Sequence, residues 1–474
     1  MLLLLYNDEK IHSQTEIIMN INDYKASLKG AHVTVVGLGV SNIPLIDLLL
    51  DAGAIVTGRD RKPSGVFPLE NELEDKGVRL ILGEDYLAGE FDPLVFRSPG
   101  IRPDIPEFEN AKSKGSIITS EMELFFDVCP CPVFAVTGSD GKTTTTTVSE
   151  LMLRQGKRTF LGGNIGKPLI GEAERMTSED VAVVELSSFQ LQSMKKSPQF
   201  AAVTNITPNH LNWHRDMSEY INAKANIFRY QDHGGRLVLN YENEITRAFA
   251  KEARGEYIFF SSGREPDCEN AVFLKDGTVI MRYKGKESEL FETKSVVIVG
   301  MHNIENYMAA AALTHGYTVN GAVKNVATTF GGVEHRCQLV REKDGVRFYN
   351  SSIDSSPTRT LACLSSFECP VVIILGGYDK NLDYTPLSDE LYKKARAVVC
   401  TGAAMEKIYS QTVKSVSGGP VFVKEPDFDA AVRRAASLAC AGDAVVLSPA
   451  CASFDAFANF EQRGRHFVSL VESI

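Results

Sequence analysis

The stretch VFAVTGSDGKTTTTT, residues 133–147, decides the fold of this chain, because it reads as a buried strand, a glycine-rich turn and the first turns of a helix. At a helix N-terminus the backbone N–H groups point outward and carry partial positive charge, so they hold phosphate oxygens. The common phosphate loop has a glycine at the position of Val136, which this chain lacks. A tight turn with an exposed lysine is the alternative, but Gly-Lys-Thr directly after a buried strand favours a nucleotide site.

The residues of this loop have distinct expected roles. Lys142 is expected to reach the terminal phosphates of a nucleotide, and the hydroxyl of Thr143 is placed to ligate Mg²⁺. Both groups would neutralise negative charge on the phosphates. The predicted nucleotide-binding residues of the loop are Gly138, Ser139, Asp140, Gly141, Lys142, Thr143 and Thr144.

The bulk composition is that of an ordinary soluble protein, with 44% hydrophobic and 23% charged residues over 474 positions. A net charge of −10 argues against a general nucleic-acid or membrane-surface binder, because no basic surplus exists to neutralise phosphates. The nine cysteines include no CxxC pair, which predicts reduced thiols in a cytoplasmic protein. The opening MLLLLY is too short for a signal-peptide core and lacks a basic start.

Short apolar runs with helix-like segments between them predict an α/β protein with parallel sheets. The runs fall into three series, and a hairpin is expected at 271–286, with KDGT as its turn. The expected strands are 33–37, 54–58, 79–83 and 93–98, then 133–137, 181–185, 201–205 and 236–240, then 346–350, 371–375, 397–400, 421–424 and 444–448.

The length of the chain indicates about three domains. Two prolines in DVCPCPV interrupt the first series, and paired glycines in FGGVEHR mark the second boundary. We therefore predict a loose extension over 1–18, a Rossmann-like domain over 19–129, a central P-loop ATPase-like domain with a mainly parallel sheet over 130–332, and a Rossmann-like C-terminal domain over 333–474.

The first module carries a partial dinucleotide fingerprint. In VTVVGLGVSN, Gly37 and Gly39 follow a strand, and Asp60 stands at a Rossmann-like distance. The third glycine of the fingerprint is replaced by Asn42, so these residues leave NAD and another phosphate ligand equally open. An NAD-dependent oxidoreductase is therefore one rival function, and a P-loop regulator without catalysis is another.

The shorter TGxxGKT loop resembles the ATP-binding loop of the Mur ligase family, the ATP-dependent peptide-forming enzymes of cell-wall precursor synthesis. Further motifs with the same resemblance extend over about residues 30–470. They are GGNIGKPL (162–169), ELSSFQL (185–191), NITPNHLNWH (205–214), AKANIF (223–228), GMHNIENYMAA (300–310), EHRCQLV (334–340) and LSPACASFDAFANFEQRG (447–464).

The resemblance implies a reaction and its catalytic residues. A substrate carboxylate attacks ATP to give an acyl phosphate and ADP, and an incoming amine then displaces phosphate. Two Mg²⁺ ions are implied, held by Thr143, by Glu185 at the end of a buried strand, by His210, and by Lys224 after carboxylation by CO₂. Carboxylation turns a cation that would repel the metal into an anionic oxygen donor. Lys142, Lys224, His210 and Glu185 are thus the expected catalytic residues.

The resemblance also assigns the ligand contacts. The HNxxN element, His302, Asn303 and Asn306, together with Arg336, is expected to contact ATP. The last motif is similar to that of the family branch that adds D-glutamate to UDP-N-acetylmuramoyl-L-alanine. The residues expected at the UDP-linked substrate are Gly37, Gly39, Val40, Ser41, Asn42, Asp60, Arg61, Ser98, Pro99, Gly100, Asn164 and Ser187, and those expected at D-glutamate are Lys380, Ser453, Phe460 and Ser355.

Several features of the sequence depart from this branch. Ser351 and Ile353 stand in NSSIDSSPTR where many relatives have aspartate and lysine, and Asp354 and Arg359 are possible substitutes. A related Mur-type or folylpolyglutamate-type ligase with another acceptor is the nearest alternative. The expected partners are small molecules, without nucleic acid or membrane, and a monomer is expected.

Overall fold

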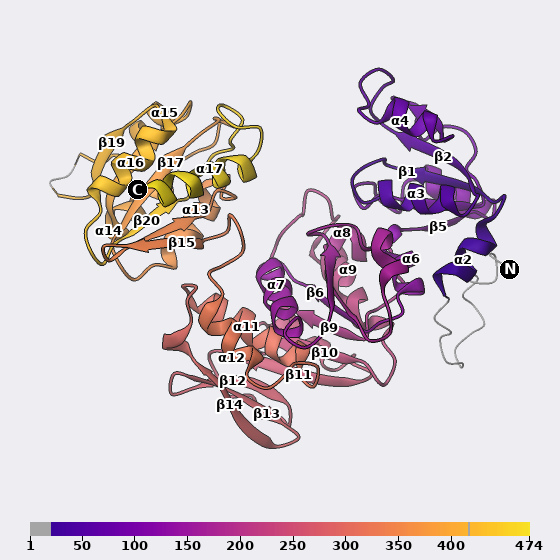
Figure 1. Cartoon of the computed structure of the whole chain (residues 1–474), viewed down its shortest axis with the longest axis horizontal. Helices are drawn as coiled ribbons and strands as arrows, with labels where there is room; N and C mark the ends of the chain where they lie inside the picture. Colours follow the sequence, from indigo (N-terminus) through magenta and orange to yellow (C-terminus); the bar gives the residue numbers. More distant parts are fainter. Residues whose placement is uncertain (1–19, 416–417) are drawn as a thin grey trace. The chain divides into compact units, whose positions relative to one another are not determined.

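The computed structural model describes residues 20–415 and 418–474, so the extension expected over 1–18 lies outside the described residues. Three sheets carry the fold (Figure 1), and every strand expected from the sequence is present in one of them. The α/β class with mainly parallel sheets is therefore confirmed.

The first sheet has five parallel strands in the order β3-β2-β1-β4-β5, which is a Rossmann-like arrangement. The strand β5 was not expected, because three residues are too few to show a pattern. The strands are β1 (His32–Val36), β2 (Ile55–Asp60), β3 (Arg79–Leu82), β4 (Leu94–Arg97) and β5 (Ile117–Thr119), and the helices are α2 (Ile21–Leu28), α3 (Ile43–Asp51), α4 (Glu70–Asp75), α5 (Pro106–Ser113) and α6 (Glu121–Val128).

The second sheet has nine strands in the order β14-β13-β12-β11-β10-β9-β6-β8-β7. It is parallel from β7 to β12, and the expected hairpin is the antiparallel pair β12–β13. Its strands are β6 (Val133–Thr137), β7 (Thr159–Gly163), β8 (Val181–Glu185), β9 (Phe200–Val203), β10 (Arg236–Asn240), β11 (Glu256–Ser261), β12 (Ala271–Lys275), β13 (Thr278–Tyr283) and β14 (Lys286–Glu292).

The helices between residues 142 and 329 include α7, whose first turns are formed by the run of threonines as expected. They are α7 (Lys142–Leu153), η1 (Leu169–Arg175), α8 (Ser188–Leu191), α9 (Met217–Arg229), α10 (Glu244–Phe249), η2 (Thr293–Ser295), α11 (Met301–Thr314) and α12 (Ala322–Thr329).

The third sheet has six strands in the order β15-β16-β20-β17-β18-β19, parallel except for the edge pair β15–β16. Its strands are β15 (Gln338–Lys343), β16 (Val346–Asn350), β17 (Val371–Gly376), β18 (Ala395–Thr401), β19 (Val421–Lys424) and β20 (Ala444–Leu447). Its helices are α13 (Pro357–Ser365), α14 (Leu387–Lys394), α15 (Met405–Thr412), α16 (Phe428–Leu438) and α17 (Phe460–Ser473).

The central strands are apolar along their whole length because parallel strands are covered on both faces. Every residue of β6, β8, β17 and β20 is buried. Parallel strands also place their carboxyl ends at one edge of a sheet, which is where ligands bind in such folds. The phosphate loop follows β6 at that edge.

The chain divides into two compact units, 1–291 with 305–324 and 292–304 with 325–474. The first two sheets belong to the first unit and the third sheet to the second. The three-domain boundaries at 130 and 333 stay a prediction. Within the described ranges, no helix is long and apolar enough to cross a membrane. All nine cysteines lie in those ranges as free thiols.

Candidate active site

The phosphate loop connects β6 to α7 through two glycines in the left-handed region. Gly138 has φ 152° and Gly141, the N-cap of α7, has φ 78°. A Cβ at Gly138 would collide with Thr204 Oγ1, and a Cβ at Gly141 would collide with Asn306 Oδ1. These positions therefore need glycine. The two glycines allow the tight turn that leads from β6 into α7, where the N–H groups of the first helical turn point toward a phosphate.

A neighbouring segment, which follows β9, holds the loop in place. The N–H of Ser139 donates to the Asn205 carbonyl oxygen at 2.9 Å, and the N–H of Asp140 donates to Asn205 Oδ1 at 2.9 Å. Ser139 Oγ lies 3.0 Å from the Thr207 carbonyl oxygen and 2.9 Å from the Tyr220 hydroxyl. The loop is thus preorganised by the same segment that leads to His210.

Two lysines meet at one carbonyl group of this loop. Lys142 Nζ donates to the carbonyl oxygens of Gly138 at 3.0 Å and Ser139 at 2.9 Å, and Lys224 Nζ donates to the Gly138 oxygen at 2.7 Å. Burial and then the charge of Lys142 lower the pKa of Lys224 well below its ordinary value of 10.5. A lower pKa favours the neutral amine, which is the form that reacts with CO₂, so the direction of the shift is the one that carboxylation needs.

Glu185 fits a cation at the end of β8. Its side chain is 1% exposed, and Oε1 accepts a hydrogen bond from Asn164 Nδ2 at 2.7 Å. Among the residues that the structure describes, no group hydrogen-bonds to the other buried oxygen, Oε2. A buried carboxylate oxygen without a donor is costly unless a cation meets it, and Mg²⁺ prefers such oxygens.

His210 lies in the segment that follows β9. Its backbone is in the left-handed conformation, with φ 54°. Burial, and then the charges of Lys142 and Lys224, lower the pKa of His210 below its ordinary value of 6.5. The imidazole is therefore neutral near pH 7, as a metal ligand must be. In the part of the chain that the structure describes, no three His, Cys, Asp or Glu side chains form a ready metal group. The proposed set therefore depends on Thr143 and on carboxylated Lys224.

The Gly-rich loop after β1, residues 37–42, is held by hydrogen bonds to the side chains of Asp60 and Asn42. The N–H of Leu38 donates to Asp60 Oδ2 at 2.8 Å, and Asn42 Nδ2 donates to the Gly37 carbonyl oxygen at 2.8 Å. Gly37 has φ 82°, and a Cβ there would come within 2.6 Å of Ser98 Cβ. Asp60 thus shapes the loop in this structure, and the loop lies against Ser98, which was also predicted to contact the UDP-linked substrate.

The other residues predicted at the UDP-linked substrate lie on exposed turns or cap a helix. Val40 is 80% exposed beside Gly39 and Ser41, and Arg61 is exposed beside Asp60. Ser187 caps α8 in a capping box with Gln190. Substrate binding by these residues, and by Pro99, Gly100 and Asn164, stays a prediction.

The residues expected at D-glutamate follow adjacent strands of the third sheet. Tyr378 and Ala452 form a β-bridge, with the Tyr378 N–H donating to the Ala452 carbonyl oxygen at 3.0 Å. This bridge places the loops of exposed Lys380 and buried Ser453 side by side. Ser355 follows β16, the neighbour of β20, and Phe460 starts α17.

The HNxxN element is divided between the two units. Asn306 belongs to the first, where its Oδ1 accepts a hydrogen bond from Thr145 Oγ1 at 3.2 Å beside the phosphate loop. His302 and Asn303 belong to the second unit, where Asn303 Nδ2 donates to the Val299 carbonyl oxygen at 2.6 Å. The contacts of His302, Asn303 and Arg336 with ATP stay predictions.

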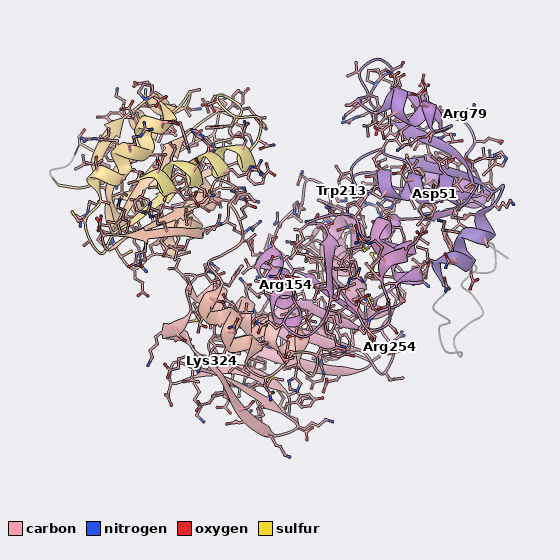
Figure 2. All side chains as sticks on the ribbon, in the orientation of Figure 1. Asp51, Arg79, Arg154, Trp213, Arg254 and Lys324 are labelled. Atoms are coloured by element: carbon pink, nitrogen blue, oxygen red, sulfur yellow. The ribbon has the colours of Figure 1, made fainter. Side chains whose placement is uncertain are left out.

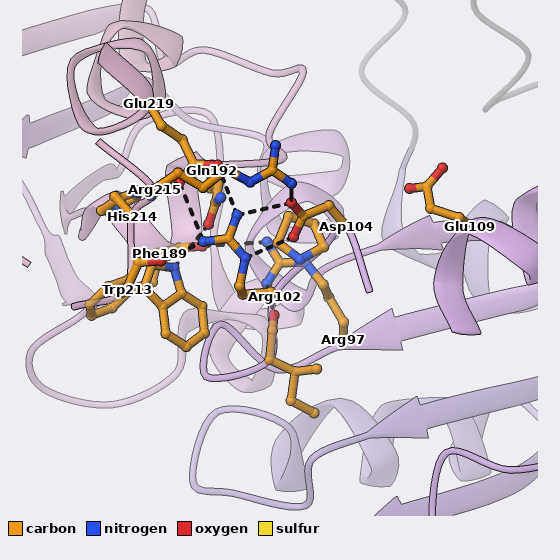
Figure 3. Close-up of polar contacts among 12 residues, drawn as sticks. Arg97, Arg102, Asp104, Glu109, Phe189, Gln192, Trp213, His214, Arg215 and Glu219 are labelled. Carbon is orange, nitrogen blue, oxygen red and sulfur yellow. Dashed lines mark hydrogen bonds and ion pairs between the residues drawn. The ribbon is translucent and has the colours of Figure 1, made fainter. Parts of the chain in front are cut away.

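The sequence reasoning missed the polar residues that join the segment after β4, with Ser98 and Gly100, to the segment that carries His210. Arg102 and Glu219 stand in no motif, and Arg97 and His214 were given no role, although His214 ends the motif NITPNHLNWH (Figure 3). It also left the role of Asp354 open. Its Oδ2 accepts a hydrogen bond from Ser448 Oγ at 2.8 Å, so this carboxylate is engaged inside the second unit.

A phosphate loop beside a buried lysine and a buried, unpaired carboxylate oxygen defines a nucleotide-dependent α/β enzyme. Comparisons with known families make this class specific. The model described as "Mur ligase middle domain" matches residues 136–314, and "Mur ligase, glutamate ligase domain" matches residues 335–451. The chain belongs to the Mur ligase family.

Two relatives show how far the similarity extends. The chain is 47% identical to UDP-N-acetylmuramoylalanine–D-glutamate ligase of Acetivibrio thermocellus over 465 residues, which cover 96% of this chain and 99% of the relative. It is 45% identical to the enzyme of that name from Clostridium novyi over 460 residues, with the same coverage. The expected family membership is confirmed.

Among solved structures, the MurF ligase of Thermotoga maritima in complex with ADP has a TM-score of 0.55 at 16% identity, covering 95% of this chain and 96% of that one. The MurC ligase of the same organism has a TM-score of 0.53 at 19% identity, covering 93% and 99%. Similarity at this level of identity supports the fold.

Proposed function

We propose that this chain is an ATP-dependent ligase that joins D-glutamate to UDP-N-acetylmuramoyl-L-alanine in peptidoglycan precursor synthesis, with release of ADP and phosphate. The observation that carries the proposal is the 47% identity to a ligase of this specificity along almost the whole of both chains. The phosphate loop with its two lysines and the buried oxygen of Glu185 supply matching chemistry.

The first half of the reaction takes place at the phosphate loop. The N–H groups at the start of α7 hold the phosphates, and Lys142 leaves the carbonyl oxygens of Gly138 and Ser139 to reach them. The carboxylate of the UDP-linked substrate attacks the γ-phosphorus. The bond between that phosphorus and the ADP oxygen breaks, and an acyl phosphate forms.

Mg²⁺ would be held by Thr143, Glu185, His210 and carboxylated Lys224. When bound, it neutralises the charge shared by ATP and the attacking carboxylate. Asn164 fixes the orientation of Glu185 through the 2.7 Å hydrogen bond to Oε1 and leaves Oε2 for the cation. The carboxylation itself is tested by ¹³C NMR after equilibration with ¹³C-bicarbonate. A carbamate signal is expected in the wild type and none in Lys224→Met.

The second half joins the amino acid. Lys380 offers a cation to a carboxylate of D-glutamate, while Ser453, Ser355 and Phe460 complete the contacts. The neutral amine attacks the acyl carbon, and the tetrahedral intermediate collapses with loss of phosphate to give the amide. The balance requires one proton to leave the attacking nitrogen as the amide forms.

The remaining assignments belong to the same proposal. The domains 19–129, 130–332 and 333–474 bind the UDP-linked substrate, ATP and the amino acid, and the enzyme works as a cytoplasmic monomer. His302, Asn303, Asn306 and Arg336 contact ATP. The UDP-linked substrate is held by the residues from Gly37 to Asn42 named above, with Asp60, Arg61, Ser98, Pro99, Gly100, Asn164 and Ser187.

The test is phosphate release from ATP and Mg²⁺ with UDP-N-acetylmuramoyl-L-alanine, supplied in turn with D-glutamate, L-lysine or meso-diaminopimelate. Release that requires D-glutamate is expected. Release with another amino acid would keep the ligase reaction and overturn the assignments of Lys380 and Ser453. Full turnover by Lys142→Ala would contradict the role of the phosphate loop.

A further inference from the structure

Arg102 lies in the segment that follows β4 and carries the substrate loop with Ser98 and Gly100. Its guanidinium joins this segment to the one with Trp213 and Glu219, as Figure 3 shows, and His210 precedes Trp213 by three positions in that segment. Nε and NH2 donate to the two carboxylate oxygens of Asp104 at 2.8 and 2.9 Å, and NH2 also donates to Glu219 Oε1 at 2.8 Å. NH1 donates to the Trp213 carbonyl oxygen. One side chain thus contacts its own segment and two points of the other.

Glu219, on the first turn of α9, extends the contact toward the predicted metal site. Its Oε2 accepts a hydrogen bond from the Arg215 N–H at 2.8 Å and lies 3.4 Å from His214 Nδ1. The other ring nitrogen of His214 lies 3.0 Å from Ser188 Oγ on α8, three residues after Glu185. The contacts from Arg102 through Glu219 and His214 therefore end on α8, the helix that follows Glu185.

Aromatic packing connects the same cluster to His210. The Phe189 ring lies 4.9 Å from the ring of His210 and 4.9 Å from that of Trp213, centroid to centroid. Trp213 Nε1 donates to Gln192 Oε1 at 3.0 Å. The segment with His210 is therefore held from one side by α8 and from the other by Arg102.

A second arginine, Arg97, also hydrogen-bonds to the segment that follows β4. Arg97, which is 1% exposed, donates to the Ile101 carbonyl oxygen at 3.0 Å and to Ser193 Oγ at 2.5 Å. Burial lowers the pKa of Arg97 to about 10, so the guanidinium remains charged at neutral pH. Arg97 therefore joins the segment with Ser98 and Gly100 to Ser193, which follows α8.

Arg102, Asp104, Arg215 and Glu219 form a cluster of alternating charges, the Arg102 cluster. The side chains of Arg102 and Glu219 are 22% and 21% exposed, so solvent screens their attraction only partly. Hydrogen bonds to Asp104 and Glu219 raise the pKa of Arg102, and the hydrogen bond from Arg102 lowers the pKa of Asp104. A bidentate arginine holds geometry more strictly than a lysine would.

We propose that Arg102 is a positioning residue that couples binding of the UDP-linked substrate at one loop to metal binding by His210 at the other. The proposal rests on the proposed function, since it takes Ser98 and Gly100 as substrate contacts and His210 as a metal ligand. Coupling between two sites is reciprocal, so substrate must tighten metal binding by the factor by which metal tightens substrate binding.

The test measures metal binding with Mn²⁺ as a paramagnetic stand-in for Mg²⁺, by electron paramagnetic resonance, with ADP present. Each protein is titrated with and without saturating UDP-N-acetylmuramoyl-L-alanine, whose own binding is measured by calorimetry. In the wild type the substrate is expected to tighten Mn²⁺ binding about five-fold or more. In Arg102→Gln the substrate still binds, and the tightening is expected to fall to less than about two-fold.

Trp213 gives a second readout, because it is the one tryptophan of the chain and is labelled in Figure 2. Loss of the Arg102 contact to its carbonyl group is expected to increase quenching of its emission by acrylamide in the ligand-free variant. In steady-state assays, Arg102→Gln is expected to lower kcat about ten-fold and to raise the half-saturating Mg²⁺ concentration, with the KM for ATP unchanged.

Arg215→Gln is the matched control. Arg215 contacts Asp104 and Glu219 in the same cluster, but its side chain is 69% exposed, and none of its hydrogen bonds with the described residues reaches the Trp213 carbonyl group. This variant is expected to keep the wild-type coupling, and Arg102→Lys should recover only part of it. Equal coupling in Arg102→Gln and the wild type would overturn the proposal, as would a wild type without coupling. Absence of substrate binding to the wild type would instead overturn the proposed function.

Discussion

Lys224 Nζ lies 2.7 Å from the carbonyl oxygen of Gly138, so a lysine on α9 is fixed against the first residue of the phosphate loop. The same group donates to Thr137 Oγ1 at 3.2 Å. The side chain is 1% exposed, and Lys142 reaches the same carbonyl oxygen. Two cations at one acceptor repel each other, which favours loss of a proton from one of them or addition of an anionic group.

The first prediction concerns the pH dependence of stability at Lys224. Its pKa is lower in the folded chain than the ordinary 10.5, so the unfolded chain binds more protons between the two values. Stability therefore rises with pH through that window. In bicarbonate-free buffer, the free energy of unfolding of the wild type relative to Lys224→Met is expected to increase from pH 7 to pH 10. Urea unfolding at each pH measures the difference.

The exposed residue Lys251 provides the control for this measurement. The Lys251→Met variant is expected to stay parallel to the wild type over the same pH range. A constant difference between the wild type and Lys224→Met would show that Lys224 keeps its proton on folding.

The second prediction concerns Gly141. A Cβ at this position meets Asn306 Oδ1, and φ 78° is strained for any other residue. Gly141→Ala is expected to lower the free energy of unfolding by about 1–3 kcal/mol and to abolish detectable ATP binding. Calorimetric titration with ATP and chemical denaturation check the two effects separately.

A second substitution separates collision from backbone strain. Asn306→Ala in the Gly141→Ala background removes the colliding oxygen and is expected to recover part of the stability. The left-handed backbone is still required, so full recovery of stability would contradict the strain at Gly141.

The third prediction concerns Glu121, which is 5% exposed on α6 and accepts a hydrogen bond from the Ile170 N–H at 3.3 Å. Burial raises the pKa of Glu121 from 4.5 to about 7. The folded chain then binds more protons than the unfolded chain between these values, so stability falls as pH rises from about 4.5 to about 7 and levels off above.

Glu121→Gln keeps an oxygen for the Ile170 N–H and removes the charge. Relative to the wild type, its free energy of unfolding is expected to rise by about 3 kcal/mol between pH 4.5 and pH 8, the equivalent of the raised pKa. Denaturant midpoints across this range give the difference. Glu84→Gln, at an exposed position, should show no such trend.

The fourth prediction concerns the choice of amino acid. Lys380→Met is expected to raise the KM for D-glutamate about 10- to 100-fold, because a charge-assisted hydrogen bond to a carboxylate is lost. The KM for ATP should stay within about two-fold of the wild type, since Lys380 is not placed at the nucleotide. Steady-state assays with each substrate varied in turn measure both values.

Lys393 on α14 of the same unit, with a side chain 69% exposed, offers a control of equal charge. Lys393→Met is expected to leave both KM values unchanged. A parallel rise in the KM for ATP and D-glutamate in Lys380→Met would point to a general disturbance of the unit and against a specific contact.

Local pattern predicted most of the fold. Continuous apolar runs such as 133–137 and 371–375 predicted the buried parallel strands, and the KDGT turn predicted the hairpin of β12 and β13. The missed strands include β5, with three residues, and the edge strands β14 and β15, where exposed residues dilute the pattern. Edge and short strands are set by their neighbours, which a local reading does not see.

The sequence by itself determined the phosphate loop, because its chemistry is contained in consecutive residues from Gly138 to Thr144. It also indicated Glu185 through its place at the end of a buried strand. Lys224 and His210 needed the family resemblance, since a lone lysine or histidine carries no pattern.

Only the tertiary structure decided the environment of these groups. The shared carbonyl oxygen that binds Lys142 and Lys224, the bare oxygen of Glu185 and the contacts of Arg102 with Glu219 join residues up to 117 positions apart. Burial, charge proximity and hydrogen bonding act through space, so they exist only after folding brings such residues together.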